Sequence, residues 1–363
     1  MKIYLIAGEK SGDQHAAKIV KELTKDKNVE IRGWGGDKLK SQGMHLHRHI
    51  DEVSYMGFWE VLKNLKKIYN LINECKDDIL QFSPDLVLLV DYPGFNLRIA
   101  EFAHKNKITT YYYISPKIWA WKKSRINKIR KYVNRMFVIF PFEQEYYRDF
   151  NLNVEYLGNP VFEDINDKKF NFDYNKKPVI SLFPGSREQE VSLVLPVMLE
   201  VVKFFPDYNF VISATNSFNI DFYNTYIDKY ENVDLIYDKS LEILSVSKAA
   251  LVTSGTATLE TALMNVPQIV CYKTSNLSYL IAKYLVKIKY ISLVNILLDK
   301  ESVVELIQSK LTVENLRQNL DHILKDQNIK EIKSDYKTLK SLLSTKQKVS
   351  EAIAKEIFSI KNS

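Results

Sequence analysis

Cysteine is scarce in this chain of 363 residues: Cys75 and Cys271 are the only two, and they lie far apart in the sequence. This excludes a disulfide framework and fits a reducing compartment. Glycine and proline are also few, with 11 and 10 residues, whereas 46% of the residues are hydrophobic. Such a composition is typical of a folded globular protein and excludes extensive disorder.

Long apolar runs are missing as well, because no segment approaches the ~20 residues that a membrane-spanning helix needs. The opening residues MKIYLIAGEKSGD contain a short apolar run that ends at Gly8. A signal peptide needs a longer apolar region and a small-residue cleavage site, so we expect the first strand of the fold here. The sequence therefore predicts a protein that is not integral to a membrane, and leaves open that it lies on one.

The sequence contains no Asp-x-Asp, the usual cue for a metal-bound nucleotide diphosphate. His45, His47 and His49 alternate, so a strand would place all three on one face, as in a metal site. An exposed edge strand explains the alternation equally well, and no carboxylate pattern accompanies it. We therefore predict no metal and no cofactor. The formal charge of +7 suggests an anionic partner without identifying it.

Short β-rich apolar runs alternate with helical patterns along the whole chain, which predicts an α/β protein with parallel sheets wound by right-handed βαβ units. The length favours two domains, and the polar stretch 162–177 separates two sets of strands. We place an N-terminal domain at 1–165, a second domain at 166–340, and a C-terminal helix at 341–363 that is available to pack back on the first. The expected strands are Ile3–Ala7, Glu30–Trp34, Leu86–Val90, Thr109–Tyr113 and Met136–Phe140, then Val179–Phe183, Phe210–Ser213, Leu235–Tyr237, Ala249–Val252 and Gln268–Cys271.

The stretch LFPGSREQEV, residues 182–191, indicates a buried strand, a tight turn and the start of a helix. Arg187 is unexpected there, because the first turn of a helix already carries positive dipole charge. A dianionic ligand explains it: free backbone N–H groups after Gly185 and Ser186 and a guanidinium fork would converge on phosphate oxygens.

The stretch TSGTATLE, residues 253–260, has the same strand–turn–helix pattern. Small residues at Ser254, Gly255 and Thr256 let a phosphate approach the start of the helix. Glu260, about one turn later, could accept hydrogen bonds from both hydroxyls of a ribose. A capping motif is the alternative interpretation.

Two turns in the first half carry acidic candidates. GEKSGD, residues 8–13, fails both the P-loop and the Gly-x-Gly-x-x-Gly tests. Ser11 and Gly12 would form a sugar-contacting turn with Glu9 available to hydroxyls; alternatively, Ser11 or Asp13 is simply an N-cap. Asp91 ends the apolar strand Leu86–Val90, where partial desolvation would raise its pKa toward use as a general base; a turn aspartate is the commoner role.

The stretch SPKIWAW, residues 115–121, leads into a basic segment that no acidic residue interrupts. Aromatic residues among cations suit single-stranded RNA and equally an anionic membrane surface; a solvated helix face is the third interpretation. The segment 58–67 is apolar on one face with lysines beside it, as in an interfacial helix or a core helix. The candidate membrane-facing residues are Phe58, Trp59, Leu62, Lys122, Lys123 and Arg125.

Together these motifs resemble the lipid-A-disaccharide synthase family. The resemblance runs in the expected order from residue 3 to about 310 and is carried by AGExSGD (7–13), Met56-Gly57, SPxxWAW (115–121), Pro141-Phe142-Glu143, PGSR (184–187), SGTAxLE (254–260) and YISLxN (290–295). It departs at Gly94, where the family often has an acidic residue, and at Val294, where a proline is common. The departure at Gly94 affects expected acceptor contacts, whereas Asp91 is present.

The resemblance implies a GT-B fold, with two Rossmann-like domains whose parallel sheets face an interdomain cleft, and a helical C-terminal tail. It implies an inverting transfer from UDP-2,3-diacylglucosamine to 2,3-diacylglucosamine 1-phosphate, giving a β-1,6-linked disaccharide phosphate and UDP. Asp91 is the first candidate for the base and Glu9 the second, Arg187 would neutralise the departing UDP, and Asn295 would contact nucleotide or sugar. Acylated substrates imply a cytoplasmic protein in peripheral contact with the anionic inner face of the membrane and no nucleic-acid partner.

Two other classes remain open at this stage. A different GT-B enzyme, such as a UDP-N-acetylglucosamine transferase or 2-epimerase, would share the phosphate and ribose contacts. A basic RNA-binding protein would use the region 119–135 but leaves Arg187, Glu260 and Asp91 unexplained.

Overall fold

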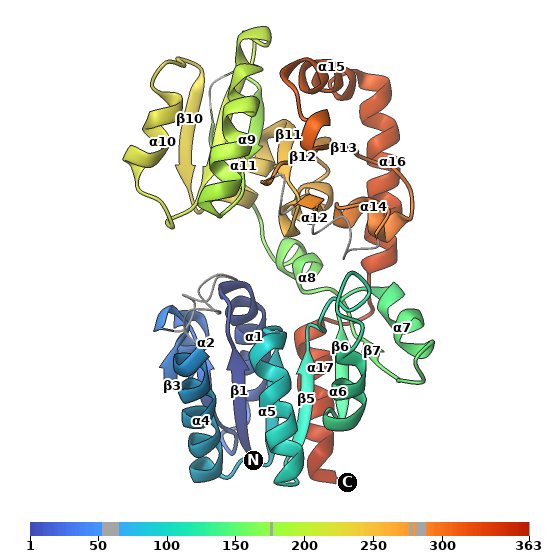
Figure 1. Cartoon of the computed structure of the whole chain (residues 1–363). Helices are drawn as coiled ribbons and strands as arrows, with labels where there is room; N and C mark the ends of the chain where they lie inside the picture. Colours follow the sequence, from blue (N-terminus) through green and yellow to red (C-terminus); the bar gives the residue numbers. More distant parts are fainter. Residues whose placement is uncertain (53–64, 175–176, 276–278, 281–287, 363) are drawn as a thin grey trace. The chain divides into compact units, whose positions relative to one another are not determined.

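The structure is a computed structural model that describes residues 1–52, 65–174, 177–275, 279–280 and 288–362. The chain forms two compact units: Met1–Pro160 with Thr345–Ser363, and Val161–Ser344. The sequence prediction placed the two boundaries after residues 165 and 340. Each unit contains one parallel sheet and its own hydrophobic core (Figure 1).

The first unit is built on a seven-stranded sheet in the order β3-β2-β1-β4-β5-β6-β7, and all its neighbouring strands pair in parallel. The central strands are apolar along their whole length because both faces of the sheet are covered. The strands are β1 (Lys2–Ala7), β2 (Glu30–Gly35), β3 (His45–His49), β4 (Leu86–Val90), β5 (Thr109–Tyr113), β6 (Arg135–Val138) and β7 (Glu155–Tyr156).

Alternate side chains of β1 enter two different cores. Tyr4 and Ile6 belong to the core that also contains apolar residues of α4, α5 and α6. Ile3 and Leu5 belong to the opposite core, which contains residues of α1 and α17. The helices of this unit are α1 (Lys10–Leu23), α2 (Asp37–Ser41), α4 (Leu65–Phe82), α5 (Pro93–Lys105), α6 (Arg125–Tyr132), α7 (Pro141–Arg148) and α17 (Val349–Phe358), with short 3-10 helices η1 (Ile50–Glu52) and η4 (Ser359–Asn362).

The C-terminal helix α17 lies in the first unit although it follows the whole second unit in the sequence. Ile353 and Ile357 share a buried core with Ala16 and Val20 of α1. Arg135 of β6 joins the same helix through an ion pair with Glu356, at 2.7 Å, and also pairs with Glu155 of the neighbouring strand β7, at 2.6 Å. In Figure 1 this helix, coloured red, lies beside the blue and green elements of the first unit.

The second unit repeats the plan with a six-stranded parallel sheet in the order β10-β9-β8-β11-β12-β13. The sequence analysis missed its edge strand β13, which is only four residues long and has a single buried residue. The strands are β8 (Val179–Phe183), β9 (Asn209–Ala214), β10 (Val233–Tyr237), β11 (Ser247–Thr253), β12 (Gln268–Tyr272) and β13 (Val304–Ile307).

The helices of the second unit flank this sheet. Apolar residues of α9 and α15 enter one core with Ile180 and Leu182 of β8, whereas Phe183 of the same strand packs with Leu244 of α11. The helices are α8 (Pro160–Asn166), α9 (Glu188–Glu200), α10 (Ile220–Ile227), α11 (Ser240–Val246), α12 (Thr256–Leu263), α14 (Leu293–Leu298), α15 (Val313–Ile323) and α16 (Asp326–Leu343), with η2 (Val202–Phe204) and η3 (Gln308–Lys310).

Strand order reverses at one point in each sheet. In the first unit β1 and β4 are neighbours, and the chain winds outward from them in opposite directions; in the second unit β8 and β11 hold the same position. Open α/β sheets bind ligands outside the carboxyl ends of the strands at such a switch point. The α/β prediction is confirmed. We therefore expect ligands at the turns that follow these four strands. None of the helices in the described ranges combines the length and apolarity that crossing a bilayer requires.

Candidate active site

The two acidic turns of the first unit lie on either side of its switch point. Glu9 precedes α1 directly after β1, and Asp91 follows β4, which pairs with β1 up to Ala7 and Val90. The topology thus brings together two turns that are far apart in the sequence, and the charges of Glu9 and Asp91 interact.

Asp91 is half-buried in this turn and is electrostatically perturbed. Removal from water is the main cause that raises the pKa of its carboxyl, and the negative charge of Glu9 raises it further; Lys117 and His15 oppose them, leaving a pKa of about 6. A carboxylate with this pKa is largely ionised at neutral pH and basic enough to accept a proton from a hydroxyl in a transition state.

Both Asp91 and Tyr92 adopt left-handed backbone conformations, with φ of 47° and 48°. Two successive non-glycine residues in this region are uncommon, and such strain concentrates at functional sites. The Tyr92 ring stacks on Phe95, with centroids 5.6 Å apart, and lies against Gly8. The turn after β4 is therefore packed directly onto the turn after β1.

The other expected residues of the GEKSGD turn divide by burial. Glu9 and Ser11 are exposed, whereas Gly12 is buried. Asp13, which the sequence analysis considered only as a cap of its own helix, is buried and accepts hydrogen bonds from Gly36 N at 2.6 Å and from Lys38 and Leu39 N at 3.2 Å. Its role is to fix the start of α2, since its carboxylate satisfies backbone donors there.

The SPKIWAW stretch follows β5 and is held by one buried carboxylate, Glu143 of α7. Glu143 Oε1 accepts hydrogen bonds from Ser115 Oγ at 2.8 Å and Trp119 Nε1 at 3.1 Å. Its Oε2 accepts from the backbone N–H groups of Ile139, at 3.1 Å, and Phe140, at 3.0 Å. Burial raises the pKa of Glu143, although these four donors favour its charged form. These bonds fix the stretch near Asp91. The positive charge of Lys117 in this stretch lowers the pKa of the Asp91 carboxyl.

The basic segment beyond Trp121 is only partly a free surface. Trp121 is 38% exposed, with Lys122 Nζ 4.4 Å from its ring centroid, and Lys123 is exposed. Arg125 is half-buried: burial lowers the pKa of its guanidinium, and its charge interacts with Tyr112 and Asp91. Arg125 therefore belongs to the electrostatic surroundings of Asp91, and its expected membrane-facing role stays a prediction.

Three other membrane candidates, Phe58, Trp59 and Leu62, lie outside the described residues.

The three alternating histidines lie on the edge strand β3. His47 contacts Glu74 and Asp78, both at 3.2 Å, and His49 contacts Asp51 at 3.3 Å. Within the described ranges, no group of three or more His, Cys, Asp or Glu side chains is arranged to hold a metal ion.

Arg187 holds the corresponding switch-point position of the second unit, directly after β8. It precedes α9, its side chain is 82% exposed, and its Nη1 lies 3.3 Å from Glu190 Oε1 one turn along the helix. Glu190 Oε2 also accepts a hydrogen bond from Ser186 N at 3.4 Å. Gly185 has a φ of 106°, and a Cβ on it would meet the Glu190 side chain at 2.6 Å. The PGSR turn thus requires glycine and presents an exposed guanidinium.

The SGT turn follows β11, the other switch-point strand of this unit. Gly255 and Thr256 are exposed, and Gly255 has a φ of 156° with open space where a Cβ would be. Ser254 Oγ donates a hydrogen bond to Ile291 O at 2.8 Å, so the turn is attached to the YISLxN segment. Glu260 lies half-buried in α12.

Asn295 makes its side-chain hydrogen bonds within the second unit. It is fully buried, its Nδ2 donates to Val303 O at 2.8 Å and Glu305 Oε1 at 2.9 Å, and its Oδ1 accepts from the backbone N–H groups of Ser302 and Val303. These bonds use all the hydrogen-bonding capacity of an asparagine amide. Asn295 thereby fixes the loop before β13, and its expected contact with nucleotide or sugar stays a prediction.

Glu305 of β13 is a residue that the sequence analysis missed. Its carboxylate accepts hydrogen bonds from Ile291 N and Ser292 N, both at 2.9 Å, in addition to Asn295 Nδ2. Through Ile291 this carboxylate supports the SGT turn. No sequence signal marks it, because it lies ten residues beyond the motif on an edge strand.

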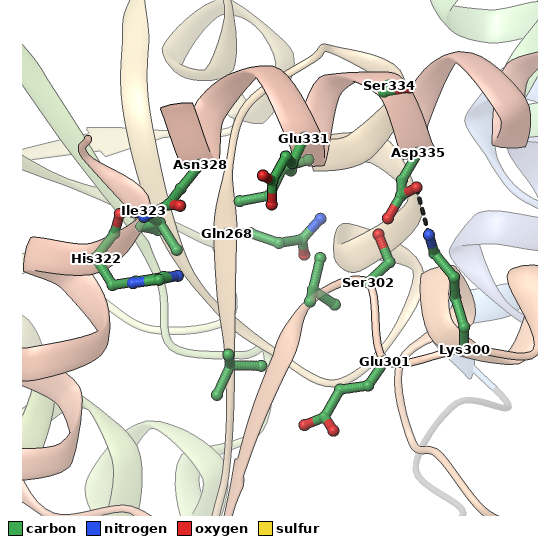
Figure 2. A pocket seen from close by; sticks show the side chains of 13 residues that line it. Gln268, Lys300, Glu301, Ser302, His322, Ile323, Asn328, Glu331, Ser334 and Asp335 are labelled. Carbon is green, nitrogen blue, oxygen red and sulfur yellow. Dashed lines mark hydrogen bonds and ion pairs between the residues drawn. The ribbon is translucent and has the colours of Figure 1, made fainter. Parts of the chain in front are cut away.

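A cavity of about 540 Å³ lies elsewhere in the second unit, among α15, α16 and the loop before β13 (Figure 2). The Lys300–Asp335 ion pair, at 2.5 Å, lies at one end of it, and Gln268 projects into its centre. None of the predicted site residues that the structure describes lines this cavity. It is therefore separate from the switch-point turns.

The protein has two doubly wound units. The switch-point turns carry Asp91, whose pKa is raised, in the first unit and the exposed Arg187 in the second. This arrangement places the protein in the GT-B class. Solved structures support this fold. The chain resembles a UDP-GlcNAc 2-epimerase from Neisseria meningitidis bound to UDP-GlcNAc, with a TM-score of 0.66, 15% identity and coverage of 99% of this chain and 100% of that one. It also resembles the calicheamicin glycosyltransferase CalG4, with a TM-score of 0.63, 13% identity and coverage of 99% and 98%.

Sequence relatives define the protein more closely. A family described as lipid-A-disaccharide synthetase matches residues 3–358. Relatives named lipid-A-disaccharide synthase include one from Coxiella burnetii, 33% identical over 91% of this chain and 90% of its own length, and one from Syntrophus aciditrophicus, 36% identical over 89% and 88%. The chain belongs to the lipid-A-disaccharide synthase family and is a glycosyltransferase of lipid A biosynthesis.

Proposed function

We propose that this enzyme joins UDP-2,3-diacylglucosamine to 2,3-diacylglucosamine 1-phosphate with inversion at the anomeric carbon. The observation that carries the proposal is the half-buried carboxylate of Asp91, with a pKa of about 6, at the switch point of a sheet. An inverting transfer needs a single base at the attacking hydroxyl, and this group has the protonation state for that role at neutral pH.

In the proposed reaction Asp91 accepts the proton of the acceptor's 6-hydroxyl as its oxygen attacks the donor's anomeric carbon. The new carbon–oxygen bond forms while the bond to the UDP phosphate breaks, and the bonding electron pair leaves with UDP. The negative charge of Glu9 raises the pKa of the Asp91 carboxyl, which makes this carboxylate a stronger proton acceptor.

The second unit supplies the donor contacts in this proposal. Arg187 and the backbone N–H groups after Gly185 and Gly255 neutralise the charge that develops on the departing diphosphate. Glu260 accepts hydrogen bonds from the ribose hydroxyls. Support comes from the open space beside Gly255, where an added Cβ would meet nothing within 4 Å, and from the exposure of the Arg187 guanidinium.

We further propose that no metal takes part and that the protein acts at the inner face of the cytoplasmic membrane, where acylated substrates reside, without a nucleic-acid partner. Exposed Lys122, Lys123 and Trp121 support contact with an anionic surface. Cations attract such a surface, and a tryptophan ring suits its interfacial region.

Release of UDP from UDP-2,3-diacylglucosamine, measured with and without the acylated acceptor, tests the proposal. We expect UDP release that depends on the acceptor and a disaccharide phosphate as product. Conversion of UDP-N-acetylglucosamine to its 2-epimer without an acceptor would instead assign the chain the activity of its epimerase-like structural neighbour, and would refute the proposal.

A further inference from the structure

The backbone of Asp91 is held by three hydrogen bonds. Its N–H donates to Tyr113 O at 2.9 Å, and its carbonyl accepts from two side chains, the hydroxyl of Tyr112 and Nδ2 of Asn96 at 2.8 Å. Asn96 Nδ2 also lies 3.2 Å from Val90 O, the last residue of β4. The carbonyl of Asp91 is thus fixed from both β5 and α5.

Both donating side chains are buried completely. Water cannot replace these buried donors. Loss of either side chain would therefore leave the Asp91 carbonyl with one hydrogen bond fewer. Burial also raises the pKa of the Tyr112 hydroxyl, which keeps it protonated and able to donate. The two bonds therefore persist over the whole working pH range.

The bonds hold a conformation that the chain would otherwise avoid. Asp91 and Tyr92 are both left-handed, a conformation that persists only where the surrounding structure over-determines it. In an ordinary extended or helical conformation the chain would leave β4 in a different direction. The Asp91 side chain would then lose its half-buried position beside the GEKSGD turn, and the Tyr92 ring its contact with Gly8.

We propose that Asn96 and Tyr112 are positioning residues for the base: together they clamp the Asp91 carbonyl and so hold its carboxyl in the partly desolvated position from which it accepts the acceptor's proton. This inference rests on the proposed function of Asp91. Neither residue touches substrate, because both side chains are buried beneath the turn and act through Asp91 alone.

The clamp predicts a change in acidity as well as in rate. The charged and titratable groups that interact with Asp91 or the clamp are Glu9 and His15 from the first turn and α1, Lys117 from the turn after β5, Arg125 from α6 and Tyr147 from α7. Substitution of Asn96 or Tyr112 changes none of these charges. A lower Asp91 pKa in the variants would therefore report renewed solvation of its carboxyl, because desolvation is the largest cause of the elevation.

Tyr112→Phe is the primary test, because it removes one hydroxyl and retains the buried ring. We expect kcat to fall about tenfold or more with KM nearly unchanged, as a small misplacement of a reacting group produces. We also expect the acid limb of the pH–kcat profile to move from about pH 6 toward the ordinary carboxyl value of about 4. Asn96→Leu, which removes the second donor at similar volume, should have the same two effects.

Tyr4→Phe is the matched control. Tyr4 is also fully buried, in the same sheet, and its hydroxyl donates to Asp78 Oδ2 at 2.6 Å, away from Asp91. It should lower the melting temperature while leaving kcat and the acid limb unchanged. If Tyr112→Phe and Asn96→Leu behave like Tyr4→Phe, with lower stability alone, the clamp is structural and the inference is wrong.

A direct titration separates this inference from the proposed function. The Asp91 carboxyl can be followed by NMR in protein labelled with ¹³C at aspartate carboxyl carbons, with its signal assigned by its loss in Asp91→Asn. A lower Asp91 pKa in Tyr112→Phe supports the clamp even if Asp91→Asn proves active, a result that would refute only the role of Asp91 as base. An inactive Asp91→Asn with an unshifted carboxyl pKa in Tyr112→Phe would overturn the clamp and leave the base assignment intact.

Discussion

Gly8 lies directly against the ring of Tyr92: a Cβ built on Gly8 would be 2.3 Å from Tyr92 Cδ1 and 2.4 Å from Cγ. Real Cβ atoms do not approach other heavy atoms so closely, so no residue but glycine fits without displacing the ring. The two residues belong to the turns after β1 and β4, which carry the candidate carboxylates Glu9 and Asp91. Their contact couples the geometry of one turn to that of the other.

Gly8→Ala should therefore damage both stability and turnover. Displacing the Tyr92 ring is a case of overpacking, which destabilises by about 1–3 kcal/mol, and it moves the turn that holds Asp91. Thermal unfolding and kcat measure the two effects. Gly94→Ala is the control for stability, because an added Cβ at Gly94 meets nothing within 4 Å; an equal loss of melting temperature in both variants would contradict the argument.

Asp91→Asn should abolish glycosyl transfer and leave UDP affinity nearly unchanged, since the proposed role is proton abstraction. In the unsubstituted enzyme, turnover should fall as the pH drops through about 6, because protonation removes the base. Initial rates between pH 4.5 and 8.5 and UDP titration by calorimetry measure these effects. Loss of UDP affinity as large as the loss of turnover would make Asp91 a donor-site or structural residue instead.

The same substitution should stabilise the fold above pH 6. The folded-state pKa of Asp91 is raised above the unfolded value, so its contribution to stability is most favourable below pH 4 and is lost as pH rises through about 6. A neutral asparagine escapes this loss, which we put at about 1–2 kcal/mol after allowance for partial exposure. Urea unfolding at pH 8 and pH 4 should show the gain only at pH 8; equal stability of both proteins at pH 8 would contradict it.

Arg187→Ala should reduce turnover by about two to three orders of magnitude, because it removes charge stabilisation of the departing diphosphate. Its melting temperature should not change, since the side chain is 82% exposed and its pair with Glu190 is a surface contact. Arg317→Ala is the matched control, an arginine of the same unit with a similar i,i+3 partner, Glu314 at 2.9 Å. Comparable rate losses in the two variants would remove Arg187 from the site.

Lys122→Glu combined with Lys123→Glu should release the protein from anionic vesicles. Each cation near such a surface contributes roughly 1 kcal/mol, and high salt should mimic the release. Arg125 is left unchanged because its charge interacts with Asp91. Vesicle sedimentation measures binding, and turnover on detergent-dispersed substrates should change much less.

The control for vesicle binding is Lys330→Glu with Lys333→Glu, two exposed lysines of α16 whose replacement alters the net charge equally. Equal release by both pairs would show that only net charge matters. Binding that ignores salt and both pairs of substitutions would show that attachment lies elsewhere in the chain.

Several features follow from local sequence alone. The alternation of apolar runs with helical patterns determined two parallel α/β units, because period and length are properties of neighbouring residues. The glycine-containing turns after Ile3–Ala7, Val179–Phe183 and Ala249–Val252 could be identified in the same way, since only certain residues fit such turns. The sequence also marked Asp91, as the polar residue that ends an apolar strand.

Only the tertiary structure decided which of the candidate polar groups are bonded within the protein. Asn295 belongs to a recognisable motif, yet its amide is used by Ser302, Val303 and Glu305. In the sequence Arg125 is one of several cations of a basic segment. In the structure it is half-buried, and its charge interacts with Asp91. Hydrogen-bond partners and desolvation depend on residues brought together from distant strands, and no local pattern encodes them. For the same reason the pKa of Asp91, and the Asn96 and Tyr112 bonds beneath it, emerge only when β4, β5 and α5 pack together.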